Sequence, residues 1–162
     1  QVVSCSLFAV GGIKTYFIRN KLKQWCTTTT GVILDIGSGD EKWGKYVGED
    51  TRYITLDYIP TASHYPWRSC KPDINGDGLA LPLRDNCIDA VLNVCVLEHI
   101  TSPEQLIKEV ARVLRPGGLL LLVGPGDITV SHGEPYCFFN ISSTTFISMA
   151  NNIFNRCSIC IW

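Results

Sequence analysis

The stretch that decides the fold is Val32-Ile33-Leu34-Asp35-Ile36-Gly37-Ser38-Gly39, an apolar strand that runs directly into a glycine-rich turn. Glycines allow the backbone to come close to a ligand. Doubly wound α/β folds bind their ligands at the carboxyl edge of the sheet, where such a turn lies. A tight strand-to-helix turn without a ligand would use the same residues, so the turn alone leaves both interpretations open.

A second apolar run favours the ligand interpretation. It extends from Tyr53 to Leu56 and ends in Asp57, twenty residues after Gly37. A carboxylate at this spacing can accept hydrogen bonds from both ribose hydroxyls of a nucleoside cofactor. The third glycine of a dinucleotide fingerprint is absent, since Lys42 stands in its place, and no GKS or GKT segment of a phosphate-binding loop is present. The pattern therefore indicates a nucleoside site without a pyrophosphate.

The rest of the chain alternates short apolar runs with helical or irregular segments, which is typical of parallel strands joined by crossover helices. We expect one helix at Lys14–Cys26, which the breaker run Thr27–Thr30 ends, and another at Ser142–Phe154. The expected strands are Val32–Ile36, Tyr53–Leu56, Asp73–Asn75, Ile88–Asn93, Leu119–Val123 and Cys157–Trp162.

A further helix, before the strand at Leu119–Val123, carries the clearest signals. Ser102 can serve as N-cap, Pro103 occupies the first helical position, and Gln105 completes a capping box. The segment Arg115–Gly118 then ends the helix. An apolar stripe predicts its buried face, consisting of Leu106, Ile107, Val110, Val113 and Leu114.

Length and composition exclude several classes of protein. The 162 residues suffice for one domain, and 14 Lys and Arg against 15 Asp and Glu, without a dense basic block, argue against a nucleic-acid partner. The eight cysteines lie scattered in apolar runs, so we expect reduced thiols and a cytoplasmic location. The apolar stretch Val2–Ile13 is shorter than the roughly 20 residues that span a bilayer, and it lacks the features of a signal peptide. We therefore expect no stable membrane insertion.

Five motifs follow one another between Gly31 and Pro125, namely Asp35–Gly39 (DIGSG), Asp57, Asp77–Leu83 (DGLALPL), Val96–Ile100 (VLEHI) and Arg112–Gly118 (RVLRPGG). In this order and spacing they resemble the class I S-adenosylmethionine-dependent methyltransferases of the small-molecule, methyltransferase type 11-like group. The resemblance implies an α/β fold with a Rossmann-like, doubly wound, mostly parallel sheet and helices on both faces. It divides the chain into a lead-in segment with a helix, residues 1–30, and an S-adenosylmethionine-binding methyltransferase domain, residues 31–162.

Two features depart from the family pattern. Glu41 replaces the third motif glycine, which bears on the details of the turn. Domains of the family close with two more strands, arranged as a hairpin beyond the fifth strand, and only Cys157–Trp162 is available here for one of them. We therefore expect the domain to be truncated at its carboxyl end.

The resemblance implies S-adenosyl-L-methionine as the cofactor and assigns its contacts position by position. Gly37 and Gly39 would let the turn pass close to the methionine part, and Asp57 would hold the ribose. Asp77 matches a contact to the adenine edge, with a plain turn residue as the alternative, and Asn93 would lie beneath the sulfonium. The expected cofactor-binding residues are Asp35, Ile36, Gly37, Ser38, Gly39, Asp57, Tyr58, Asp77, Gly78 and Asn93.

The implied reaction is an in-line displacement at the methyl carbon of a sulfonium, in which the protein contributes alignment and desolvation. A base is needed only if the acceptor must lose a proton. The candidates are His132 in the long loop after the fifth strand, and His99 with Glu98 after the fourth. Each of these side chains could instead cap or pack.

We expect no metal. Some related quinone O-methyltransferases hold a divalent cation with a carboxylate three residues before the Glu-His pair, and Cys95 occupies that position here. Cys157 and Cys160 form a single CxxC pair whose side chains would point to opposite faces of a strand, which argues against zinc.

The sequence thus predicts a methyltransferase that uses S-adenosylmethionine to methylate a small-molecule acceptor such as a quinone, sugar, lipid or natural product. The alternative is a non-catalytic, methyltransferase-like scaffold that binds a protein partner, whose signature would be loss of the glycine turn or of Asp57. An NAD-dependent oxidoreductase is disfavoured by the missing third glycine and by Asp35. The oligomeric state is left open.

Overall fold

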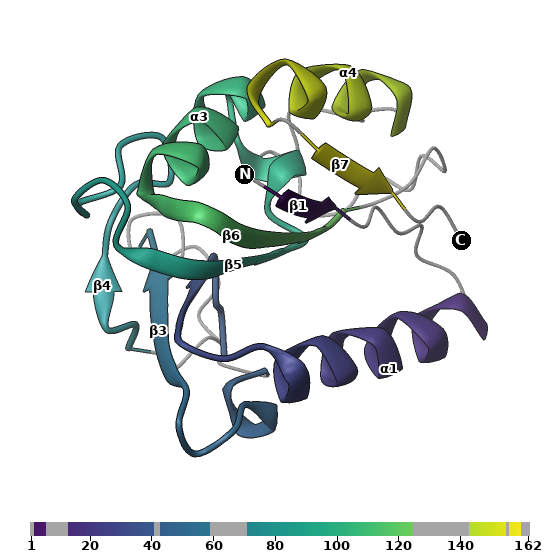
Figure 1. Cartoon of the computed structure of the whole chain (residues 1–162), viewed down its shortest axis with the longest axis vertical. Coiled ribbons are helices and arrows are strands. Elements are labelled where there is room, and N and C mark those ends of the chain that lie inside the picture. The colour runs from purple at the N-terminus through teal and green to yellow at the C-terminus, as the bar shows by residue number, and fades with distance from the viewer. Residues whose placement is uncertain are drawn as a thin grey trace.

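The chain folds around a parallel sheet (Figure 1). The computed structural model describes residues 2–5, 13–40, 43–58, 71–124, 143–154 and 156–159. The strands are β1 Val2–Cys5, β2 Val32–Ile36, β3 Arg52–Asp57, β4 Ile74–Asn75, β5 Ile88–Val94, β6 Leu114–Val123 and β7 Arg156–Ile159. The helices are α1 Ile13–Thr28, α3 Pro103–Val113 and α4 Ser143–Ile153, with 3-10 helices η1 Gly44–Tyr46 and η2 Leu97–His99.

The central sheet has five strands in the order β4-β3-β2-β5-β6, and each neighbouring pair is parallel. The chain winds outward from β2 to β3 and β4, and then crosses back to place β5 and β6 on the other side of β2. The winding direction therefore reverses between β2 and β5, and open α/β sheets bind ligands beyond the carboxyl ends of the strands at such a point. The predicted Rossmann-like, doubly wound sheet is confirmed.

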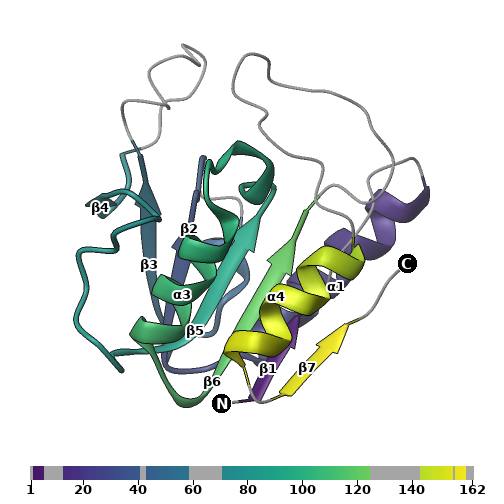
Figure 2. The same ribbon diagram turned by 90° about the horizontal axis from the view of Figure 1, so that it is seen from above.

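Helices cover both faces of the sheet (Figure 2). On β6, Leu120 and Leu122 belong to the core shared with α3 and α4, whereas Leu121 and Val123 pack with α1. This alternation follows from the pleat, which turns successive side chains to opposite faces of a strand. Because both faces are buried, the strands read as continuous apolar runs in the sequence.

Helix α1 extends beyond the predicted end at Cys26. Thr27 and Thr28, which we expected to break the helix, form its last residues. Their hydroxyls donate hydrogen bonds to the carbonyls of Lys23 and Gln24, each at 2.9 Å. Each threonine thus bonds to the carbonyl four residues before it, which keeps it compatible with the helix.

Helix α3 begins at Pro103 and buries the predicted stripe, but the predicted capping box is wrong. The Ser102 side chain makes no capping hydrogen bond. Gln105 instead directs its side-chain amide to the carbonyl oxygen of Leu79, at 3.3 Å. The side-chain amide of Gln105 therefore makes a tertiary contact instead of capping its own helix.

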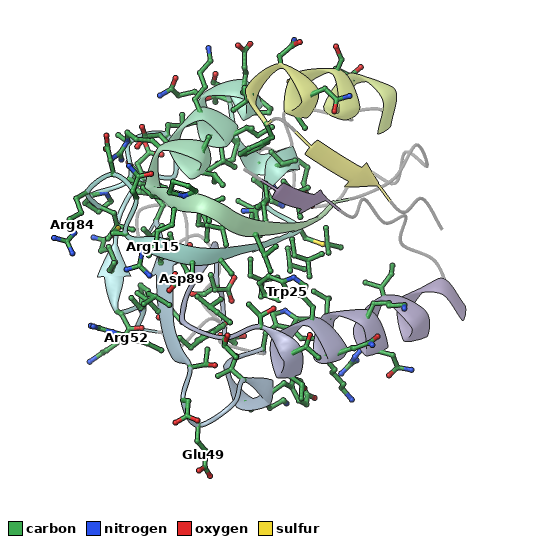
Figure 3. The ribbon with its side chains drawn as sticks, in the orientation of Figure 1. Trp25, Glu49, Arg52, Arg84, Asp89 and Arg115 are labelled. Carbon is green, nitrogen blue, oxygen red and sulfur yellow. The ribbon has the colours of Figure 1, made fainter. Side chains whose placement is uncertain are left out.

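Strand β6 starts at Leu114, earlier than the predicted Leu119, and Leu114 lies on the strand rather than on the helix. The pairing with β5 is irregular, because Ile88 pairs with Leu114 and Ala90 with Leu119. The glycine-containing segment between Leu114 and Leu119 shifts the register, and Arg115 donates a hydrogen bond from it to the Asp89 carboxylate. Figure 3 shows these two side chains together at the amino end of β5.

No strand is predicted in the first residues of the chain. Val2–Cys5 nevertheless forms β1, which lies beside β6 and pairs in parallel with β7 (Figure 2). Strand β7 falls at Arg156–Ile159, close to the predicted Cys157–Trp162. It thus pairs in parallel with a strand from the other end of the sequence, whereas the family pattern closes with an antiparallel hairpin, of which only this one strand was expected here.

The inward face of α1 carries a thiol in an apolar environment. Cys26 is fully buried beside Leu22 and Leu92. Burial raises the pKa of this thiol to about 11, and the nearby charge of Asp35 contributes in the same direction. The thiolate is the reactive form of cysteine, so Cys26 is protected both by burial and by its protonation.

We expect Cys26 to resist alkylation in the folded chain. At pH 8, iodoacetamide should label Cys26 far more slowly than the partly exposed Cys87, as followed by mass spectrometry of the peptides. In denaturant the two rates should converge, because the burial is then lost. Equal labelling rates in the folded chain would contradict the burial of Cys26 on the inward face of α1.

Candidate functional site

The glycine turn after β2 is hydrogen-bonded to the end of β3. The backbone amides of Gly37 and Ser38 both donate to the carbonyl oxygen of Leu56, at 2.8 and 3.2 Å. The amide of Gly39 donates to the side chain of Asp57, Oδ2, at 3.0 Å. Three successive amides therefore hold the turn against the carboxyl end of the neighbouring strand.

Two of the turn residues require glycine. Gly37 has φ +72° and Gly39 has φ +54°, a region that side chains disfavour. A Cβ atom on Gly37 would also lie 2.3 Å from Cγ2 of Val96, which belongs to the segment after β5. The turn is thus packed closely between the ends of β3 and β5.

The carboxylate of Asp57 is buried and oriented by the backbone. Only 7% of this residue is exposed. Its Oδ2 accepts the bond from Gly39, and its Oδ1 accepts one from the amide of Tyr58, at 2.8 Å. Tyr58 itself is 45% exposed and follows Asp57 at the sheet edge.

Asp35 lies on the α1 side of the sheet and is 1% exposed. Its Oδ2 accepts a hydrogen bond from the hydroxyl of Tyr53 on β3. Its charge also acts on the thiol of Cys26, as described above. This placement gives Asp35 a supporting position below the turn, and its predicted contact to a cofactor stays a prediction.

Two buried polar atoms near the turn have no hydrogen-bond partner within the described part of the chain. One is the hydroxyl oxygen of Ser38, and the other is the side-chain oxygen Oδ1 of Asn93. The amide nitrogen of Asn93 donates to the carbonyl of Ile36, at 3.1 Å, and the two residues face each other across β2 and β5. A buried polar atom without a partner destabilises the free protein, so such atoms are expected where a ligand supplies the missing partner.

The loop that holds Asp77 and Gly78 begins beside Asp57. The amide of Gly76 donates to the carbonyl oxygen of Asp57, at 3.1 Å, and thereby continues the pairing of β3 with β4. Oδ1 of Asp77 accepts a bond from the amide of Leu79, at 2.9 Å, which is the turn role that the sequence left open. The structure therefore brings Asp77 to the same sheet edge as Asp57.

Glu98 and His99 follow β5 in the short helix η2. Glu98 is 1% exposed, and its Oε1 lies 4.0 Å from Nε2 of His99, whose side chain is 25% exposed. Cys95, at the position where some related quinone O-methyltransferases carry a metal-binding carboxylate, has φ +55° and turns the chain out of β5. His132, with residues 41 and 42, lies outside the described residues. Within the described ranges, no group of three or more His, Cys, Asp or Glu could hold a metal ion.

The side chains that hold the Asp77 loop in place were not predicted from the sequence. Gln105, Glu109 and Arg112 project from α3 onto this loop and hydrogen-bond to its backbone. Hydrogen bonds from Arg112 are the main reason that the pKa of Glu109 lies below its usual value. Gln105, Glu109 and Arg112 are four and three residues apart, a spacing that places all three on one face of a helix. This spacing is the sequence pattern that could have identified them.

No helix among the described residues is both long enough and apolar enough to cross a membrane.

Comparison with known proteins gives related sequences. Residues 34–122 match the family described as "Methyltransferase domain". A protein of Mycolicibacterium smegmatis named "Probable S-adenosylmethionine-dependent methyltransferase" is 38% identical over 105 residues, which cover 63% of this chain and 41% of that protein. One with the same description from Mycobacterium tuberculosis is 33% identical over 131 residues, covering 75% of this chain and 47% of that protein. The chain thus spans less than half the length of these two relatives.

Solved structures support the fold. The crystal structure of a SAM-dependent methyltransferase from Archaeoglobus fulgidus has a TM-score of 0.68 and 14% identity, over 85% of this chain and 67% of that chain. At this identity the likeness concerns the fold alone. The family match covers more than half of the 162 residues and includes most of β2, all of β3 and β5 and most of β6. The chain therefore belongs to the methyltransferase domain family.

Proposed function

We propose that the chain binds S-adenosyl-L-methionine and transfers its methyl group to a small-molecule acceptor, with residues 31–162 as the methyltransferase domain. The observation that carries the proposal is the junction of the glycine turn with the end of β3, where Gly39 orients the Asp57 carboxylate. This junction lies beside the point where the winding of the sheet reverses, at the edge that binds ligands in such folds.

The residues present fit this cofactor. Asp57 would accept hydrogen bonds from the ribose hydroxyls, and its buried carboxylate is already oriented for them by two backbone amides. Ser38 and Asn93 each offer a buried oxygen for the methionine end. Asp77 would face the adenine edge. The remaining proposed contacts are made by Asp35, Ile36, Gly37, Gly39, Tyr58 and Gly78.

The chemistry requires little of the protein beyond alignment. When bound, S-adenosylmethionine supplies a methyl group that its sulfonium already activates. The chain then has to hold the acceptor in line and exclude water from the reacting atoms. If the acceptor must lose a proton, His99 and His132 are the proposed bases, with His99 partly exposed beyond the end of β5.

We infer a small acceptor from the charge of the chain. The net charge is -1 and no dense basic block is present, which leaves little to attract a nucleic acid. The scattered cysteines favour a cytoplasmic site of action, where thiols stay reduced.

Asp57→Ala should weaken binding of S-adenosylhomocysteine by about 1.5–3 kcal/mol, or ten- to a hundredfold, because hydrogen bonds to a charged group are lost. Isothermal titration of the chain with S-adenosylhomocysteine, and with NAD in parallel, measures this effect. NAD should give no saturable signal.

Glu49→Ala is the matched control for Asp57→Ala. Glu49 is an exposed acid that points away from the sheet (Figure 3), so its removal should leave the affinity unchanged. A folded Asp57→Ala variant with the affinity of the parent would remove Asp57 from the site. Absence of binding by the folded parent chain would reject the cofactor itself.

Ser38→Ala should lower the affinity for the ligand without lowering the stability of the free protein. The free protein should be as stable as the parent or slightly more so, since a buried hydroxyl without a described partner is removed. Its affinity for S-adenosylhomocysteine should nevertheless fall by about fivefold, as expected for one lost hydrogen bond of roughly 1 kcal/mol. Thermal unfolding and titration measure the two quantities.

Ser102→Ala provides the comparison, because Ser102 is exposed and makes no capping bond, so neither quantity should change. A Ser38→Ala chain that unfolds more easily than the parent yet binds equally well would show that the hydroxyl is structural.

A further inference from the structure

We propose that Glu109 and Arg112 of α3 are positioning residues, which set the place of the loop 77–85 and through it the affinity and base selectivity for the adenosine part of the cofactor. The inference rests on the proposed function, since it assumes that this loop faces the adenine. Neither residue would touch the cofactor. Both would act through the backbone that they hold.

The loop 77–85 needs such a support because its backbone has few other partners. It follows the short strand β4, and Pro82 interrupts it, so it cannot continue the parallel pairing with β3. Its first residues are fixed to the end of β3 through the bond from Gly76 to Asp57. Beyond Leu79 the loop makes two backbone hydrogen bonds of its own, from Ala80 to Asp77 and from Leu83 to Leu81. The described hydrogen bonds that join the segment 80–85 to a helix come from α3.

Arg112 and Glu109 together bond to both backbone groups of Leu81. Glu109 Oε2 accepts from the amide of Leu81, at 2.8 Å, and Arg112 Nη2 donates to the carbonyl of Leu81, at 3.0 Å. Arg112 Nη1 donates further to the carbonyl of Leu83, at 2.7 Å, and to the carboxylate of Asp85, at 2.8 Å. Two side chains therefore define the position of the loop at three residues.

The two side chains also fix each other. Arg112 donates from Nε to Oε1 of Glu109, at 2.9 Å, and from Nη2 to Oε2, at 2.7 Å. The side chains are 30% and 14% exposed, so the pair is partly withdrawn from water. A two-point bond of this kind has a fixed geometry, which the single ammonium of a lysine cannot reproduce.

The apolar side of α3 limits how closely the loop can approach the helix. A Cβ atom on Gly78 would lie 3.0 Å from Cδ1 of Leu106, so the loop already touches the helix there. Leu106 prevents the loop from approaching the helix, and Arg112 prevents it from moving away. The position of the Asp77–Gly78 segment beside Asp57 thus depends on the bond from Gly76 to the end of β3 and on one face of α3.

The test compares Arg112→Lys and Glu109→Gln with Glu104→Gln. Glu104 lies on the same helix and forms an exposed ion pair with Lys108, at 2.8 Å, away from the loop. Affinities are measured by isothermal titration for S-adenosylhomocysteine and for S-inosylhomocysteine, in which an oxygen replaces the adenine amino group. The ratio of the two affinities reports base selectivity, and thermal unfolding reports stability separately.

We expect each of the two loop-contacting variants to lower the affinity for S-adenosylhomocysteine by about tenfold and to reduce the ratio, because the loop no longer holds one position at the base. Glu104→Gln should behave as the parent. If Arg112→Lys does not fold, Glu109→Gln decides, since it keeps the shape of the side chain.

A ratio that stays at the parent value in a folded variant, even with a lower melting temperature, would overturn the inference and leave the pair a purely structural role. A parent chain that binds both compounds equally would overturn it as well, because there would be no base selectivity to set. A folded parent that binds neither compound would reject the proposed function, and the inference with it.

Discussion

The hydrogen bonds from the turn 37–39 to the end of β3 are the constraint on which the rest of the site depends. They exist only because the parallel register places Ile36 opposite Leu56, so that the next amides reach the Leu56 carbonyl and the Asp57 side chain. A shift of the register by one residue would turn Asp57 to the other face of the sheet. The site is therefore a consequence of strand pairing, which the apolar residues of β2 and β3 enforce by burial.

Burial of charge is the cost of this arrangement. Asp35 and Asp57 are both at least nine-tenths buried at or near the carboxyl edge. Charged groups in such places need compensating hydrogen bonds. The Tyr53 hydroxyl serves Asp35, and backbone amides serve Asp57. Buried carboxylates at this edge are thus stabilised by hydrogen bonds from the protein itself.

The features that local sequence patterns determine could be predicted from the sequence. Strands β2, β3 and β5, the apolar stripe of α3 and the glycine turn with Asp57 follow from periodicity and from the special conformations of glycine. It did not predict β1, because the pairing partner of that strand, β7, lies at the other end of the chain. The capping box failed for the same reason, since Leu79 binds the side chain of Gln105. Both errors arise from contacts between residues distant in sequence, which a local pattern does not contain.

Helix α3 brings two separate sequence motifs into contact, the LPL segment and the RVLRPGG segment. Its apolar residues at Leu106 and Val110 complete the core, while the polar face formed by Glu109 and Arg112 holds the backbone around Pro82. The loop cannot satisfy these backbone groups with a strand, and a guanidinium is the side chain that can donate to several acceptors at once. The arginine that opens the RVLRPGG segment therefore bonds to the backbone of the LPL segment, so the two motifs are in direct contact in the fold.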